Sequence, residues 1–160
     1  MTPRSPTAKV ERFRSLYRSA TGFKGRLPTM AFSDDPPTAD HLATLVDRGE
    51  KTATTSVHAC YQAQGEPIPT TGDRAVVVDG TGQPVAVIAT TTVEVRRYGN
   101  INEQYAHADG HGDRTLTAWR QAHEELLDNI CADLGLPFDD DLQLVCQRFK
   151  TVWQSDKART

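Results

Sequence analysis

The spacing of apolar residues changes near residue 50, and this change constrains the fold more than any other feature of the chain. Residues 8–20 and 38–49 carry apolar side chains at the spacing of amphipathic helices. The runs 51–57, 74–79 and 84–97 are instead rich in Thr and Val, which is typical of strands. Helices segregated from short antiparallel strands predict an α+β fold.

The C-terminal half adds one long helix and one strand. Residues 115–134 form the longest helical pattern, and residues 142–153 alternate well enough for a closing strand. The polar segment 99–113 is predicted to be irregular, because glycines and acids interrupt it. These elements together predict a small curled sheet or open barrel, mostly antiparallel, with flanking helices.

Charge is distributed unevenly along the chain. Residues 1–26 carry seven Lys or Arg and one Glu, a net +6, so residues 27–160 carry −9 of the total −3. The basic segment suits contact with phosphates, and the alternative that the charge pattern favours is a solvated helix packed on an acidic body. The acidic remainder argues against a protein that binds nucleic acid over its whole surface.

Cysteines and apolar runs indicate a cytoplasmic protein without a membrane partner. Cys60, Cys131 and Cys146 are far apart and odd in number, which favours reduced thiols over a disulfide framework. No apolar run approaches the roughly 18 residues of a membrane helix. The basic N-terminus has no apolar stretch of the kind found in secretory signals.

A lysine beside a row of hydroxyls is the first candidate for chemistry. Lys51 precedes Thr52, Thr54, Thr55 and Ser56. A lysine whose burial keeps it neutral can accept the proton of a Thr nucleophile. On an ideal strand Lys51 and Thr54 point to opposite faces, so they converge only if the strand begins irregularly. The alternative is an exposed lysine on a Thr-rich strand.

The second candidate is an alternating His/Asp run. His107, Asp109, His111 and Asp113 are separated by single residues, and imidazole with carboxylate suits zinc, iron or manganese. Two glycines interrupt the run, which favours a loop in which Asp113 caps the following helix. The pattern leaves the metal site and the capping loop as alternatives.

Trp119 and His123 form a third candidate, because positions i and i+4 meet on one face of the long helix. A buried histidine with satisfied hydrogen bonds is the more common reason for such a pair. The chain has no Walker loop, GxGxxG, GxSxG or HExxH motif. Motif support is therefore missing for nucleotide-phosphate, dehydrogenase, esterase and zincin activities.

Five motifs in a fixed order carry a family resemblance. They are Gly49-x-Lys51-Thr52-x-Thr54, Gly72-Asp73, Tyr105-Ala106-x-x-Asp109-Gly110-x-Gly112-Asp113, Leu116-x-x-Trp119-x-x-x-His123 and Leu144-Val145-Cys146-x-Arg148-Phe149. Over residues 10–152 the chain resembles an ASCH domain, and more narrowly the larger bacterial members with an extra N-terminal helix. The resemblance implies one domain over residues 1–160, with a basic helical extension at 1–26 and a PUA-like β-barrel core at 27–155.

The resemblance also implies a reaction and its residues. Similar small ASCH proteins are amidohydrolases that deacylate N4-acetylcytidine, and their lysine, threonine and carboxylate fall on Lys51, Thr54 and Asp109. The family more often has glutamate at position 109, and His111 stands where a second acid is usual. As a general acid, Asp109 needs a pKa raised by burial.

The remaining expectations concern the substrate, a metal and a cofactor. Ser56, Tyr61 and His111 are predicted to contact the substrate, a small modified nucleoside. Family members keep the Gly/acid loop without a metal, so the resemblance implies neither metal nor cofactor.

Two alternatives to the amidohydrolase remain open. One is a ribonuclease in which His111, Asp109 and Lys51 supply base, acid and cation, while the basic N-terminal helix holds single-stranded RNA. The other is an RNA-binding module without enzymatic activity, which the charge of −9 over residues 27–160 disfavours.

Overall fold

A computed structural model describes residues 2–154; Met1 and residues 155–160, which include the predicted end of the core, lie outside the described residues. The chain divides into two compact units. Among the described residues, the first unit comprises 2–50, 71–91 and 149–154, and the second unit comprises 51–70 and 92–148. The single domain with a 1–26 extension and a 27–155 core stays a prediction.

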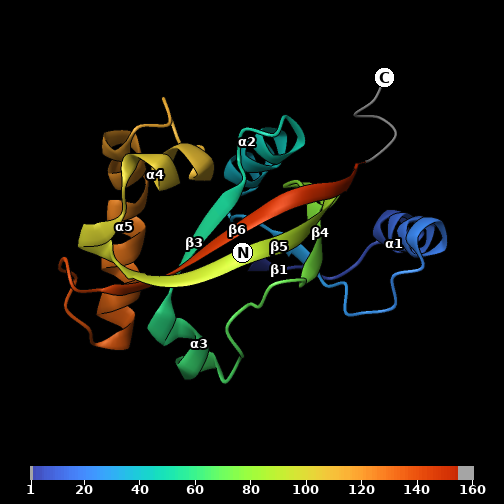
Figure 1. Ribbon diagram of the computed structural model, residues 1–160. Coiled ribbons are helices and arrows are strands. Elements are labelled where there is room, and N and C mark those ends of the chain that lie inside the picture. Colours follow the sequence, from blue (N-terminus) through green and yellow to red (C-terminus); the bar gives the residue numbers. More distant parts are fainter. Residues whose placement is uncertain (1, 155–160) are drawn as a thin grey trace. The chain divides into compact units, whose positions relative to one another are not determined.

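In the described part of the chain, six strands form one sheet in the order β1-β2-β4-β5-β6-β3 (Figure 1). Their bounds are β1 Thr2–Pro3, β2 Thr29–Ala31, β3 Ala53–Val57, β4 Arg74–Val78, β5 Pro84–Arg97 and β6 Gln143–Gln154. The pairs β1–β2, β4–β5 and β3–β6 are antiparallel, whereas β2–β4 is parallel. Within the described residues the sheet stays unclosed, and the expected α+β class is confirmed.

Five α-helices and one short 3₁₀ helix complete the described part of the chain. They are α1 Ala8–Thr21, α2 Pro36–Asp47, α3 His58–Gln64, η1 Tyr98–Asn100, α4 Glu103–Asp109 and α5 Leu116–Leu134. The sequence predicts α1, α2 and α5 but not α3 or α4, which have seven residues each. Seven residues are too few for helical periodicity to be read. None of the described helices is both long and apolar enough to cross a bilayer.

The first unit is built around apolar side chains. Val10, Phe13 and Tyr17 of α1 are buried in a cluster with Val76 of β4 and Val87 of β5. Because α1 supplies part of this interior, it is more than a solvated basic helix. Burial of these side chains is the main force that holds α1 in place.

At the N-terminus of α2, the sequence pattern predicts Thr38 as the capping residue, and this prediction is wrong. The capping residue is Asp35, whose side chain accepts from Thr38 N, rather than Thr38 itself. Pro36 and Pro37 occupy the first two helical positions, where the missing N–H of proline costs little.

The second unit packs α4 and α5 against β3 (Figure 1). β3 pairs with β6 from Ala53↔Arg148 to Val57↔Leu144. Ala53 and Val57 of β3 share a buried cluster with Tyr105 of α4 and Trp119 of α5. This packing brings the C-terminal end of α4 to the beginning of β3.

Candidate active site

Lys51 and Asp109 meet in the interior of the second unit. The Thr52 N–H donates to Ala108 O at 2.7 Å and ties the start of β3 to the end of α4. Lys51 Nζ lies 2.5 Å from Asp109 Oδ1, and the two side chains are 2% and 1% exposed. Local sequence patterns could not predict this contact, because 58 positions separate the two residues along the chain.

Backbone carbonyls also hold the side chain of Lys51 in place. Besides Asp109 Oδ1, Nζ donates to Ala53 O at 2.7 Å and to Asp109 O at 3.2 Å. Lys51 and Asp109 therefore form a buried ion pair whose lysine end is fixed by the start of β3 and the end of α4.

The position of Asp109 follows from the end of α4. Gly110 has φ +88° and closes the helix in the left-handed region that favours glycine. Asp109 is consequently the last helical residue, where the helix dipole disfavours a negative charge. The Lys51 ammonium compensates that charge.

Four more side chains surround the Asp109 carboxylate. Thr55 Oγ1 and Trp119 Nε1 each donate to Oδ2 at 2.8 Å. His111 Nε2 lies 3.4 Å from Oδ1, and His123 Nε2 lies 3.6 Å from Oδ2. One ligand atom from each of Asp109, His111 and His123 falls within 4.8 Å of the others, so these three could hold a metal ion.

The electrostatics of this cluster correct one expectation. Burial by itself would raise the pKa of Asp109, but the Lys51 charge and a hydrogen bond from His111 outweigh it and hold the pKa well below its usual range. The expected rise is therefore wrong for the resting site, and Asp109 is a carboxylate. Burial lowers the pKa of His123 and raises that of Tyr105 well above its usual value.

Thr54 and Thr55 lie on opposite faces of β3, because side chains alternate along a strand. Thr55 faces the carboxylate of Asp109, to which it donates. Thr54 contributes its carbonyl, which accepts from Tyr105 Oη at 2.8 Å. The structure thus places the hydroxyl of Thr55 on the carboxylate, whereas the sequence predicts Thr54 for the site.

The other predicted residues form two groups. His111 joins Lys51 and Asp109, and its side chain is 20% exposed. Ser56 shares the face of Thr54 by alternation, and its Oγ lies 2.6 Å from Tyr61 Oη. The predicted substrate contacts are therefore divided between the two faces of β3.

Thr55 stands in the row of hydroxyls and Tyr105 in a family motif, but no local pattern gives either a role at the site. The spacing of Trp119 and His123 predicts core residues. His123 is indeed buried, with Nδ1 2.8 Å from Trp119 O, yet its other nitrogen faces Asp109. The spacing of Trp119 and His123 shows that they share a helix face but cannot show what that face meets.

Two members of the His/Asp run lie outside the cluster. His107 is exposed on α4, and its Nδ1 lies 3.3 Å from Arg114 Nη2. Asp113 accepts from Thr115 N and Oγ1, next to the N-cap of α5. The N-cap predicted at or close to Asp113 is Thr115, whose side chain accepts from Ala118 N, so Asp113 lies close to the cap and supports it.

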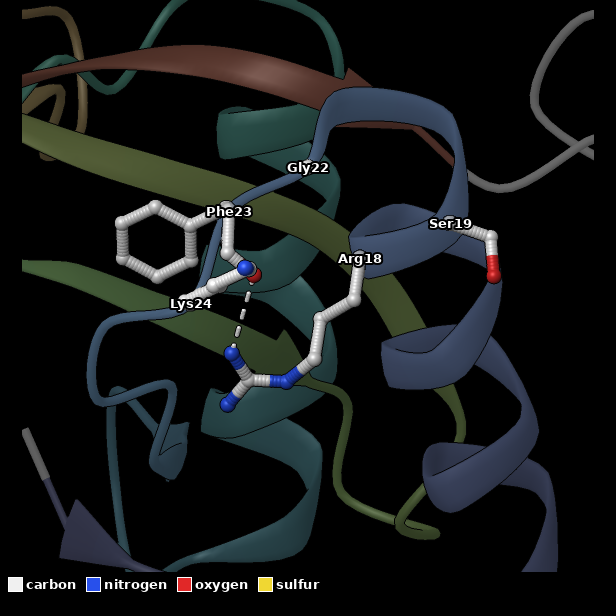
Figure 2. A pocket seen from close by; sticks show the side chains of 5 residues that line it. All are labelled: Arg18, Ser19, Gly22, Phe23 and Lys24. Carbon is white, nitrogen blue, oxygen red and sulfur yellow. Dashed lines mark hydrogen bonds between the residues drawn. The ribbon is translucent and has the colours of Figure 1, made fainter.

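A separate hollow of about 400 Å³ belongs to the first unit (Figure 2). Its lining consists of Arg18, Ser19, Gly22, Phe23 and Lys24, which follow one another around the end of α1. Arg18 Nη1 donates to Phe23 O at 3.1 Å and holds the chain that leaves the helix. The hollow thus carries two of the basic side chains of residues 1–26.

A family model described as the ASCH domain matches residues 28–153. The chain belongs to the ASCH domain family. The family predicted from the five motifs is therefore confirmed. This family has a PUA-like fold and contains RNA-binding and hydrolase-like proteins.

Two solved structures are similar to this ASCH protein. An ASCH domain from Lactobacillus crispatus JV V101 has a TM-score of 0.84 and 30% sequence identity, covering 94% of this chain and 98% of that one. Protein EF3133 from Enterococcus faecalis V583 has a TM-score of 0.83 and 30% identity, covering 94% and 92%. No curated protein matches the chain.

Proposed function

We propose that this ASCH protein is a hydrolase that removes the acyl group from N4-acylated cytosine nucleosides, with Lys51, Thr54 and Asp109 as catalytic residues. The buried Lys51–Asp109 ion pair is the observation that carries the proposal. Burying two charges costs several kcal/mol per ion, and an apolar pair of the same volume is often at least as stable. A buried pair of this kind is therefore a candidate for catalysis rather than for stability.

A proton transfer within the pair would create both reactive groups at once. Nζ and Oδ1 are 2.5 Å apart, so one proton can move from Lys51 to Asp109. The products are a neutral amine, which can accept a proton, and a carboxylic acid, which can donate one. A bound substrate that excludes water favours this neutral pair, since desolvation penalises charges.

Thr54 supplies the nucleophile in this scheme. Lys51 donates to the carbonyl of Ala53, the residue directly before Thr54. Lys51 precedes β3, so the alternation of faces along that strand does not fix the direction of its side chain. For this step the Thr54 hydroxyl, which lies on the other face of β3 from Thr55, has to turn toward Lys51 when substrate binds. The Thr54 oxygen then attacks the acyl carbon, its proton passes to Lys51, and the C–N4 bond breaks as Asp109 protonates the leaving nitrogen. Water then hydrolyses the acyl ester and releases a carboxylic acid.

The remaining residues bind or position. His111 lies at the exposed side of the pair, and Ser56 with Tyr61 lies on the face of Thr54; these three contact the nucleoside in the proposal. Thr55 is a positioning residue, because it acts through the carboxylate of Asp109. The proposal places the protein in the cytoplasm, where RNA and its nucleosides are found.

The test is release of cytidine from N4-acetylcytidine by the purified protein, followed by chromatography. Thr54→Val should lower kcat at least about a thousandfold, because it removes the nucleophile while keeping the shape of the side chain. Thr54→Ser, the matched control, keeps a hydroxyl and should retain measurable turnover. Absence of release by the wild type, or undiminished activity of Thr54→Val, would refute the proposal.

Cleavage of single-stranded RNA is a second candidate function, favoured by the basic hollow at the end of α1 (Figure 2). Deleting residues 1–26 would disturb the first unit's interior, so a charge substitution is the cleaner test. Lys24→Glu should weaken RNA binding and make the slope of log binding constant against log salt concentration shallower by about one. Lys150→Glu, an exposed control outside the segment, should leave the salt dependence at the wild-type value.

A further inference from the structure

His123 takes no part in the proposed reaction, although its side chain is only 9% exposed beside Asp109. Its Nδ1 lies 2.8 Å from Trp119 O. A carbonyl oxygen only accepts, so Nδ1 carries the proton, and Nε2 of the neutral ring presents a lone pair. That lone pair lies 3.6 Å from Asp109 Oδ2, which leaves two acceptors facing each other in a buried site.

The spacing of the surrounding donors suits a small cation. A tetrahedral zinc ion with ligand bonds of about 2.0–2.2 Å has its ligand atoms about 3.3–3.6 Å apart. His111 Nε2 lies 3.4 Å from Asp109 Oδ1, and His123 Nε2 lies 3.6 Å from Oδ2. Taken one from each residue, the three ligand atoms lie within 4.8 Å of one another, so side-chain shifts of about an ångström bring them to the spacing of zinc ligands. The rings of His111 and His123 are 4.8 Å apart and nearly perpendicular, so both can point toward one centre.

We propose that Asp109, His111 and His123 bind a divalent transition-metal ion, of which zinc best suits two imidazoles and one carboxylate. The inference does not depend on the proposed deacylation, because it concerns binding alone. It also revises the sequence-based expectation that the site needs no metal.

Hydrogen bonds from neighbouring groups orient two of the three proposed ligands, as they do in known metal sites. Trp119 O fixes the tautomer of His123 so that Nε2 is left to bind. Thr55 Oγ1 and Trp119 Nε1 orient the carboxylate of Asp109. His111 is 20% exposed, which leaves one side of the cluster open for an exchangeable fourth ligand.

Lys51 limits the affinity of this site. Its ammonium lies against Asp109 Oδ1 and offsets the negative charge that would attract a cation. Replacing Lys51 by an apolar residue should therefore tighten metal binding. A bound metal would also occupy the carboxylate that exchanges a proton in the proposed reaction, so zinc is expected to inhibit deacylation.

His111 and His107 are a matched pair of histidines for the test. His111 belongs to the cluster, whereas His107 is exposed and contacts Arg114. Zinc binding to the folded chain would be measured by equilibrium dialysis, with Co²⁺ absorption as a second readout of tetrahedral coordination. We expect one zinc per chain in the wild type and in His107→Ala, and at least tenfold weaker binding in His111→Ala. Mg²⁺ should bind neither form, because it prefers oxygen ligands.

Two outcomes would overturn the inference. One is failure of the wild type to retain zinc in dialysis at micromolar concentration. The other is equal zinc affinity of His111→Ala and His107→Ala. Lys51→Met supplies an independent measurement: zinc should raise its melting temperature more than that of the wild type, and an equal or smaller rise contradicts the proposal.

Discussion

The two units bury different kinds of side chains. Among the described residues, the buried Asp, Glu, Lys, Arg and His side chains all belong to the second unit; they are Lys51, Asp109 and His123. The interior clusters of the first unit are apolar, and removal of apolar surface from water explains them. The buried charges of the second unit weaken its stability unless they are paired. The comparison separates an apolar interior from one that also holds the charged groups of the candidate site.

The largest expected effect comes from breaking the buried pair. Lys51→Met leaves the Asp109 carboxylate buried without its partner and should lower the free energy of unfolding by about 3–5 kcal/mol. Urea unfolding in the presence of a chelator measures the change. The double variant Lys51→Met/Asp109→Leu should recover part of the loss, and a single-variant loss below about 1 kcal/mol would contradict the ion-pair assignment.

A second prediction concerns the hydroxyl that positions Asp109. Thr55→Val removes a hydrogen bond to a charged group and should cost about 1.5–3 kcal/mol of stability. Because Thr55 acts through Asp109, kcat for N4-acetylcytidine should fall while KM stays near the wild-type value. Thr55→Ser should restore kcat, whereas a purely structural residue would leave kcat of the folded fraction unchanged.

The third prediction uses pH. Burial holds the pKa of His123 below the unfolded value of about 6.5, so the unfolded chain takes up the proton first. Stability is therefore full above about pH 6.5 and declines as the pH falls toward the lower pKa of the folded state, by at most about 1.4 kcal/mol per pH unit. His123→Gln should flatten this part of the profile in urea titrations between pH 7 and 5. An unchanged slope would show that His123 is not the group responsible.

The smallest expected effect lies in the first unit. Ile88→Val removes one buried methylene from its apolar interior and should cost about 0.5–1.5 kcal/mol. Deacylation by the folded protein should be unaffected, since the site lies in the second unit. A fall in kcat with Ile88→Val would show that the division between the two units does not hold for activity.

Local patterns predicted those elements that are long enough to show a period. The helices α1 and α5 and the strands β4, β5 and β6 all lie within a few residues of their predicted bounds. The short helix α4 was predicted as irregular chain, because a seven-residue segment with a glycine at its end has no readable periodicity. That error mattered, since α4 sets the position of Asp109.

The sequence by itself determined the family, the main elements, the uneven charge and the residue types available for chemistry, because these depend on composition and local spacing. Tertiary structure alone decided that Lys51 meets Asp109, that Thr55 faces the carboxylate, and that His123 completes a cluster with His111 in place of His107. The physical reason is that these contacts form where α4 and α5 pack on the start of β3. No local pattern encodes a meeting of residues so far apart in the chain.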